Sequence, residues 1–324
     1  MPIIESSYRP SWIFRNGHLN TIIPNQFREI TEVAYVRERL ELQDGDFVDL
    51  DFSCKESKSL VLILHGLEGD STRVYAKGLV REANLKKMDA CVLNQRGCSG
   101  SNNRLLQSYH SGWTEDLRFV IEWLIDIKKY DSIYIAGVSV GGNMTLKYLG
   151  EEGSSLPHQI KAAATVSVPV DLHSCVRELA KKSNWIYMQR FLKTLKAKAK
   201  FKLEQHSPSG LNADLIMNSK SFMDYDHEFT AKINGFDSGL DYWTKNSSGQ
   251  FISEITIPTL LLTSLDDPFL GPECYPFEEA KNNSNFHLLV TKYGGHVGFV
   301  SQLPLNEKQF QEEKVFEFFE SLWK

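Results

Sequence analysis

Cysteine is scarce in this sequence, and the few cysteines form no pattern. They number five, which is odd, and no two of them make a C-x-x-C pair. A disulfide framework needs an even set of regularly spaced cysteines, so none is expected here. A chain of this kind suits a reducing compartment, and we expect a cytoplasmic protein. The cysteines are Cys54, Cys91, Cys98, Cys175 and Cys274.

Long apolar runs are missing as well. No stretch reaches the roughly 18 apolar residues that a membrane-spanning helix requires. The N-terminal residues lack the basic start and the long apolar core of a signal peptide. We therefore expect neither a transmembrane segment nor a signal peptide.

The motifs of common cofactor sites are absent too. There is no metal-ligand spacing and no Walker loop. The glycines Gly137, Gly141 and Gly142 follow a predicted strand, but their spacing differs from the G-x-G-x-x-G of dinucleotide-binding proteins. We expect no metal and no cofactor.

The chain has no excess of positive charge. Its net charge is −5, so a nucleic-acid partner is not expected. Hydrophobic residues make up 42% and charged residues 24%, which is typical of a globular protein. A length of 324 residues is enough for one large α/β domain, and we expect a single domain over residues 1–324.

Strand-like and helix-like patterns alternate along the chain. Short, continuous apolar runs are typical of strands buried on both faces. Two earlier runs, 33–42 and 47–52, flank the turn signal Asp44-Gly45-Asp46 and predict an antiparallel hairpin. The alternation predicts a mostly parallel central sheet with flanking helices on both faces. The later predicted strands are 59–64, 90–93, 133–138, 162–168, 259–263 and 286–290, and the predicted helices include 74–83, 113–128 and 310–323.

One region, residues 171–253, breaks this alternation. It is polar and helix-prone and contains no convincing buried strand. Because it falls between two predicted strands, we predict an inserted helical cap. Such a cap would cover the carboxyl ends of the strands, where ligands of open α/β sheets bind.

Within the predicted cap, residues 181–202 are rich in lysine and carry apolar residues at helical spacing. One interpretation is an amphipathic lid that touches an anionic membrane surface or an acyl chain. The favoured interpretation is a helix packed on the core with a solvated lysine face, because the whole protein is acidic. The apolar residues are Trp185, Met188, Leu192, Leu195 and Ala199.

The segment 133–143 combines a β-branched run, a glycine-rich turn and the start of a helix. Its centre, Gly137-Val138-Ser139-Val140-Gly141, has the G-x-S-x-G pattern of a nucleophile elbow, where a serine stands on a sharp turn. A side chain at either of these glycines would clash where strand and helix approach each other. We predict that Ser139 is a catalytic nucleophile.

A serine needs a base to take its proton, and the base needs an acid to orient it. In this kind of fold the chain order is nucleophile, acid, base. His296 follows two glycines after the last predicted strand, and Asp267 follows the strand before it. Asp267 is favoured over Asp266 because it precedes a proline, and Asp171 is a weaker third candidate.

A developing oxyanion needs two backbone N–H donors. We predict Val140, directly after the serine, and Leu67 in the glycine-bounded loop after strand 59–64. His65, in the same loop, is expected to shape it rather than to transfer protons. Cys98 has no obvious base nearby in the sequence, so we interpret it as a packing thiol.

Together these motifs resemble the YheT-like group of α/β-hydrolases, which includes the eukaryotic abhydrolase-domain lipases. The resemblance spans nearly the whole chain. It implies an α/β-hydrolase fold and a serine hydrolase of carboxylic esters, with Ser139, Asp267 and His296 in the triad positions. The motifs are Phe14-Arg15-Asn16-Gly17-His18-Leu19-Asn20-Thr21, His65-Gly66-Leu67-Glu68-Gly69, Asn94-Gln95-Arg96-Gly97-Cys98-Ser99-Gly100 with Ser108-Tyr109-His110-Ser111-Gly112, Gly137-Val138-Ser139-Val140-Gly141-Gly142-Asn143, and Asp266-Asp267-Pro268-Phe269 with Gly294-Gly295-His296-Val297-Gly298-Phe299.

The expected substrate is a small-molecule ester with a short- to medium-chain acyl group, because the predicted cap carries apolar residues. The same triad would also serve a thioesterase or an amidase. A non-catalytic protein that binds an acyl group or a lipid is the alternative from another functional class. Peripheral membrane contact through the cap is compatible with the sequence, which gives no indication of oligomeric state.

Overall fold

Short apolar runs form the strands of one large sheet. In the computed structural model, which describes residues 3–305 and 308–323, nine strands lie in the order β1-β9-β8-β7-β6-β4-β5-β3-β2. The other residues of the predicted single domain, 1–2, 306–307 and 324, lie outside the described residues. The strands are β1 (Ile3–Ile4), β2 (Val36–Glu41), β3 (Phe47–Ser53), β4 (Ser59–Leu64), β5 (Asp89–Asn94), β6 (Ser132–Val138), β7 (Ile160–Val166), β8 (Thr259–Ser264) and β9 (Phe286–Thr291).

The sheet is parallel except at one edge. Strands β1, β9, β8, β7, β6, β4 and β5 pair in parallel. Strand β3 runs antiparallel to β5, and β2 and β3 form the predicted hairpin, with Val36 opposite Phe52 and Glu41 opposite Phe47. The predicted α/β class with a mostly parallel sheet is confirmed.

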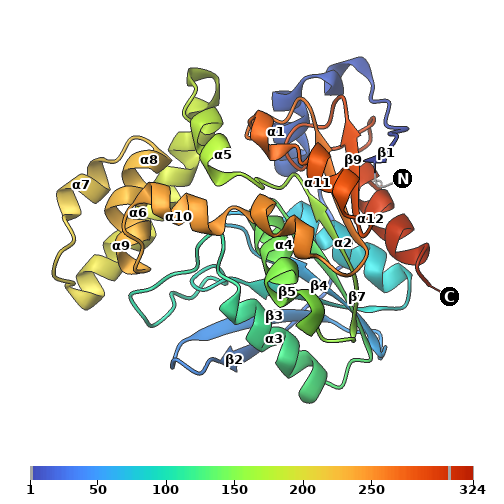
Figure 1. The fold of residues 1–324 in the computed structure, drawn as a ribbon, viewed down its shortest axis with the longest axis horizontal. Coiled ribbons are helices and arrows are strands. Elements are labelled where there is room, and N and C mark those ends of the chain that lie inside the picture. The colour runs from blue at the N-terminus through green and yellow to red at the C-terminus, as the bar shows by residue number, and fades with distance from the viewer. Residues whose placement is uncertain (1–2, 306–307, 324) are drawn as a thin grey trace.

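Both faces of the sheet are covered by helices (Figure 1). In β4, Leu60, Leu62 and Leu64 belong to the core shared with α3 and α4, whereas Val61 and Ile63 belong to the core shared with α2 and α12. This alternation follows from the two-residue period of a strand and makes all five residues buried. The covering helices are α2 (Val74–Leu85), α3 (Glu115–Asp126), α4 (Val140–Glu152) and α12 (Phe310–Glu320).

Several short elements complete the body around the sheet. The sequence patterns did not predict α1 or the two-residue strand β1. Both lie in the N-terminal part of the chain, drawn in blue at the right of Figure 1. The elements are η1 (Trp12–Arg15), α1 (Gly17–Phe27), η2 (Gly153–Ser155), η6 (Pro272–Cys274) and α11 (Phe277–Asn282).

Between β7 and β8 the chain forms helices and no strand. Residues 172–246, here called the helical segment, supply every buried residue of a third hydrophobic core except Phe269, and they extend away from the sheet at the left of Figure 1. The next element, η5 (Ser248–Glu254), returns to the body and packs on α4. The segment comprises α5 (Leu172–Leu179), η3 (Lys182–Asn184), α6 (Trp185–His206), α7 (Ala213–Asn218), α8 (Phe222–Tyr225), the π-helix η4 (Asp226–Thr230), α9 (Ala231–Ile233) and α10 (Gly239–Asn246).

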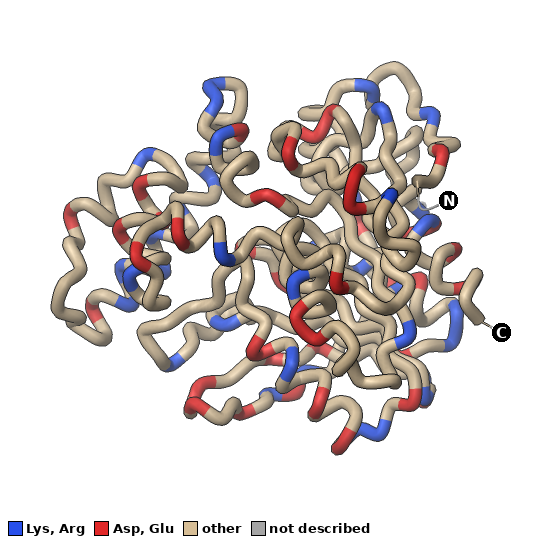
Figure 2. Tube along the Cα trace, in the orientation of Figure 1, with Lys and Arg blue, Asp and Glu red and all other residues tan. Residues whose placement is uncertain are grey.

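Charged residues of both signs are distributed over the body and the helical segment (Figure 2). Within residues 3–305 and 308–323, no helix has the length and apolarity needed to cross a membrane.

Candidate active site

Ser139 stands on a strained turn between β6 and α4. Its backbone has φ 54° and ψ −120°, a left-handed conformation that costs free energy for a residue with a side chain. A Cβ on Gly137 would lie 2.7 Å from the Cα of Gly142, and one on Gly141 would overlap the carbonyl oxygen of Leu64. The two glycines therefore allow the close approach of strand and helix that the sequence predicts.

The structure brings Ser139, His296 and Asp267 together. The Oγ atom of Ser139 lies 2.9 Å from Nε2 of His296. On the other side of the ring, Nδ1 lies 2.9 Å from Oδ2 and 3.1 Å from Oδ1 of Asp267. A proton on Nδ1 satisfies the contact with Asp267 and leaves Nε2 free to accept the serine proton. The Asp267 side chain has no exposed surface, so this contact is shielded from water.

The other two candidate acids point elsewhere. Oδ1 of Asp266 accepts a hydrogen bond of 2.9 Å from the backbone N–H of Gly295, and burial raises the pKa of this carboxyl. Asp171 caps α5 by accepting a hydrogen bond of 2.7 Å from the N–H of Ser174. Of the three acids, Asp267 is the one beside His296.

The two predicted oxyanion donors line the same cavity as Ser139. In the loop after β4, the N–H of Gly66 donates to Tyr75 and that of Glu68 donates to Tyr109. Among the hydrogen bonds of the described residues, none uses the backbone N–H of Leu67 or of Val140. Both groups are therefore free to donate to a substrate oxygen.

His65 holds this loop in place. Its Nδ1 lies 2.7 Å from the carbonyl oxygen of Gly66, and its Nε2 accepts a hydrogen bond of 3.0 Å from the N–H of Gln95. Complete burial lowers the pKa of His65 to about 4, so the ring is neutral near pH 7. These contacts agree with the predicted shaping role.

The helix α1 supports the loop that carries His296. Oγ1 of Thr21 accepts a hydrogen bond of 2.8 Å from the N–H of His296 and donates one of 2.6 Å to the carbonyl oxygen of Gly17. Oδ1 of Asn20 accepts another from Val300. The sequence assigns no role to the motif at residues 14–21. Its position beside the loop that carries His296 becomes visible only in the fold.

Comparison with known proteins agrees with this arrangement. A family model described as "alpha/beta hydrolase fold" matches residues 59–301. YheT of Escherichia coli strain K12, to which an esterase activity is ascribed in its name, is 34% identical over 96% of this chain and 92% of its own length. The chain belongs to the α/β-hydrolase family.

Other relatives agree with this membership. The human phospholipase ABHD3 is 29% identical over 99% of this α/β-hydrolase and 80% of its own chain. Among solved structures, the Pyrococcus furiosus esterase Pf2001 superposes with a TM-score of 0.60 at 16% identity, over 92% of this chain and 97% of that one. The predicted resemblance to the YheT-like group is confirmed.

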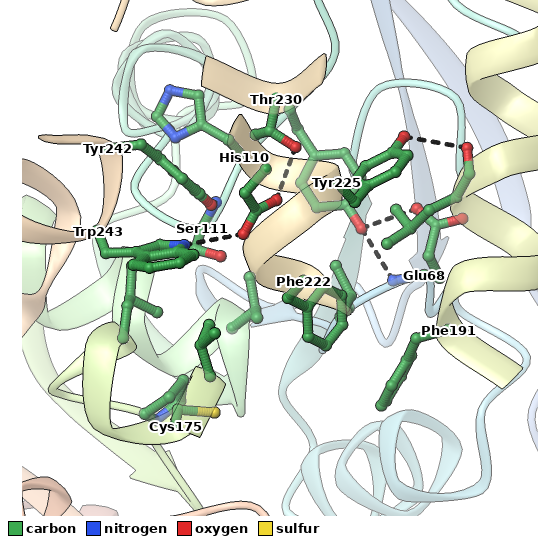
Figure 3. Close-up of a pocket in the computed structure, with 18 of the residues that line it drawn as sticks. Glu68, His110, Ser111, Cys175, Phe191, Phe222, Tyr225, Thr230, Tyr242 and Trp243 are labelled. Atoms are coloured by element: carbon green, nitrogen blue, oxygen red, sulfur yellow. Dashed lines mark hydrogen bonds between the residues drawn. The ribbon is translucent and has the colours of Figure 1, made fainter. Parts of the chain in front are cut away.

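A cavity of about 110 Å³ separates the elbow of this α/β-hydrolase from the helical segment. Ser139 and His296 line it on the side of the sheet. Aromatic residues of the helical segment also line it (Figure 3). A second hollow of about 150 Å³ reaches the same two residues from between α1 and α6. The aromatic residues labelled in Figure 3 are Phe191, Phe222, Tyr225, Tyr242 and Trp243.

Helix α6 differs in part from the expected packed helix with solvated lysines. Met188, Leu192 and Ala199 are buried as expected, but Trp185 is 62% exposed. Two lysines turn inward, because the oxygen atoms that they bind lie on loops of the body.

The first inward lysine is Lys198, whose Nζ lies 2.8 Å from Oε2 of Glu68 and 3.2 Å from Sγ of Cys98. The second is Lys202, which donates to the carbonyl oxygens of Asn103 and Leu105. Burial lowers the pKa of Lys202 to about 8. Burial also raises the pKa of Cys98 to about 12, so this thiol is a poor nucleophile, in line with its predicted packing role.

Proposed function

We propose that this protein is a serine hydrolase that cleaves carboxylic esters through an acyl-enzyme on Ser139. The observation that carries the proposal is the 2.9 Å contact between Ser139 and His296, with Asp267 on the opposite side of the ring. Such an arrangement gives a serine the base that it needs and gives that base a fixed tautomer. The relatives described as an esterase and a phospholipase support an ester as the substrate.

In the proposed reaction, Ser139 Oγ attacks the ester carbonyl carbon while His296 Nε2 takes the hydroxyl proton. The N–H groups of Leu67 and Val140 donate to the resulting oxyanion. Collapse of this intermediate breaks the bond to the alcohol, which leaves with the proton from His296. Water then attacks the acyl-enzyme with His296 as base, and the carboxylic acid is released. Asp267 keeps the imidazole oriented and stabilises its cation throughout.

The helical segment is the proposed cap, as part of the inserted region 171–253, and the cavity beneath it is the proposed acyl site. Leu172, Val176 and Phe222 are buried apolar residues on its wall, and they suit a short- to medium-chain hydrocarbon. A chain placed there would remove its own apolar surface from water, and longer chains gain affinity until the cavity is full.

The start of α6 suggests how the protein meets an apolar substrate. Trp185 and Ile186 are 62% and 65% exposed, and the following residues Tyr187 and Arg190 line the second hollow that reaches Ser139. We propose that this end of the cap makes peripheral contact with lipid surfaces. The five free cysteines support the proposed cytoplasmic location.

A fluorophosphonate probe followed by mass spectrometry tests the proposed nucleophile. Labelling is expected at Ser139, absent in Ser139→Ala and weaker in His296→Ala. Failure of the folded protein to react would contradict the proposal and favour a binding protein.

Hydrolysis of matched ester, thioester and amide substrates then tests the bond. A series of 4-nitrophenyl esters from acetate to laurate tests the acyl length. We expect the ester to be cleaved fastest, with an optimum between butyrate and decanoate. Equal rates across the series would contradict the proposed acyl site.

A further inference from the structure

Besides Glu68, which pairs with Lys198, the cavity holds a carboxylate that forms no ion pair among the described residues. Asp226 lies on the cap wall and is 9% exposed. Its Oδ2 accepts a hydrogen bond of 2.8 Å from Nε1 of Trp243, and its Oδ1 accepts one of 2.8 Å from the hydroxyl of Thr230. Both bonds are drawn as dashed lines from Trp243 and Thr230 in Figure 3. Among the ion pairs of the described residues, none includes Asp226.

A buried carboxylate without a cation is costly, because two neutral hydrogen bonds replace only part of its hydration. Each carboxylate oxygen has two lone pairs, so each accepts one more hydrogen bond than it receives here. The residue also begins a π-helix, Asp226–Thr230, a rare distortion that occurs mostly at functional sites.

A second acceptor lines the same cavity. Oδ1 of Asn234 is buried and has no hydrogen-bond partner among the described residues. Nδ2 of the same amide donates a hydrogen bond of 2.9 Å to the carbonyl oxygen of Thr230. The indole N–H of Trp243 and the hydroxyl of Thr230 already donate to Asp226. This wall therefore offers unused acceptor oxygens in a cavity whose other charged side chains, Glu68, Arg96 and Lys198, already form ion pairs.

Aromatic rings surround these acceptors. Tyr225, Phe229, Tyr242 and Trp243 all line the cavity. Ring faces carry partial negative charge, so they attract cations and disfavour anions. The imidazole of His110 also lines the cavity, and burial lowers its pKa to about 3, so it supplies no positive charge near pH 7.

We propose that Asp226 and Asn234 form a binding site for a hydrogen-bond donor at the end of the substrate's acyl chain, a hydroxyl or an ammonium group. The site makes the enzyme prefer polar-ended esters to hydrocarbon ones. This inference rests on the proposed hydrolase function and adds the substrate class. The alternative is that the carboxylate only fastens η4 to α10 through Trp243.

The test uses acyl chains matched in number of atoms. The esters are 4-nitrophenyl heptanoate, 6-hydroxyhexanoate and 6-aminohexanoate, together with decanoate, 9-hydroxynonanoate and 9-aminononanoate. We expect kcat/KM for a donor-ended ester to exceed that of its hydrocarbon match by about tenfold or more at one of the two lengths. Asp226→Asn and Asn234→Leu should lower this ratio toward one, mainly by raising KM for the donor-ended esters. The loss in Asp226→Asn should be larger for the ammonium than for the hydroxyl.

Asp237→Asn is the matched control, because it removes an exposed carboxylate from the same segment. A ratio of one or less in the unmodified enzyme at both lengths would overturn the inference. So would an equal loss on every ester in Asp226→Asn, which is the result expected of a fastening role.

Binding of the intact esters to Ser139→Ala, followed by tryptophan fluorescence, separates this inference from the proposed function. A preference for donor-ended esters in Kd without any turnover in the unmodified enzyme would leave the binding site standing and refute the hydrolase. Turnover without a preference for donor-ended esters in Kd or in kcat/KM would support the hydrolase and refute the binding site.

Discussion

At the scale of single residues, the direction of one carboxylate decides how His296 is held. Asp267 contacts Nδ1 of the ring, whereas Asp266 accepts from a backbone N–H. In Asp267→Asn the amide N–H₂ faces Nδ1, so the ring proton moves to Nε2 and the serine loses its acceptor. We expect kcat to fall by about 10³- to 10⁴-fold. Ester hydrolysis by Asp266→Asn, which retains an acceptor for Gly295, should fall less than about tenfold. A larger loss in Asp266→Asn than in Asp267→Asn would contradict the assignment.

Thr21 is a positioning residue, since it reaches the reaction only through the backbone of His296. Thr21→Val keeps the shape but removes the acceptor of the His296 N–H. An unpaired N–H costs about 1–3 kcal/mol, so we expect kcat to fall about tenfold with KM little changed. Thr21→Ser should restore kcat, because its hydroxyl accepts the same bond. A rise in KM together with the fall in kcat, without rescue by serine, would indicate a general loss of structure.

Asp226 also predicts a pH dependence of stability. Burial raises its pKa from 3.8 to about 6 in the folded protein. The folded state therefore holds this proton more tightly than the unfolded state, and the stability it contributes is lost as pH rises from 3.8 through about 6. The loss is about 3 kcal/mol once the group is ionised.

Asp226→Asn cannot ionise, and its amide can face Thr230 while its oxygen faces Trp243. Its gain in Tm over the unmodified protein should thus be larger well above pH 6 than well below it, and a pH-independent difference would refute this account.

At the scale of elements, the sequence predicts the strands of the sheet better than the helices and side chains that hold the site loops. After Ser59, the residues of β4 are all apolar because helices cover both faces of the sheet, and that pattern is visible in the sequence. Helix α1 starts with Gly17 and contains Pro24, so its own residues favour a helix weakly. It forms against the histidine loop, a contact between residues far apart in the sequence. Lys198 turns inward because it contacts Glu68, which is also far away in the sequence. The spacing of apolar residues in α6 therefore does not predict this direction.

The candidate site also has one part that the sequence predicts and another part that it does not predict. The order of Ser139, Asp267 and His296, each after a strand, follows from local patterns, because parallel strands bring their carboxyl ends to one edge. The roles of Thr21 and Asp226 depend on side chains that meet only after folding, so no local pattern indicates them.

The contact between α6 and the loop after β4 gives a prediction for these two elements. Glu68 is next to the proposed donor Leu67, and its side chain is 6% exposed, whereas that of Lys198 is 24% exposed. Lys198→Met would leave a buried carboxylate unpaired, so we expect a loss of up to about 3 kcal/mol in unfolding free energy and a lower kcat. Lys200→Met, on the exposed side of the same helix, is the control and should change neither. Adding Glu68→Gln should recover part of the stability, and an additive further loss would show that the pair is not coupled.

At the scale of the whole molecule, the helical segment builds a third hydrophobic core, which also includes Phe269 of the body and meets a core of the sheet at Leu67 and Cys175. Besides apolar contacts, polar bonds join them, among them Lys198 to Glu68, Lys202 to Asn103 and the N–H of Ser111 to Tyr242. Contiguous units of a fold can open together at lower free energy than the global transition. We expect amide exchange over 185–233 to be faster than over β4 and β6 and to follow one opening step. Lys198→Met should accelerate exchange in that segment while the sheet is unchanged. Equal protection of segment and sheet would mean that substrate enters without any opening of the segment, through the hollow between α1 and α6.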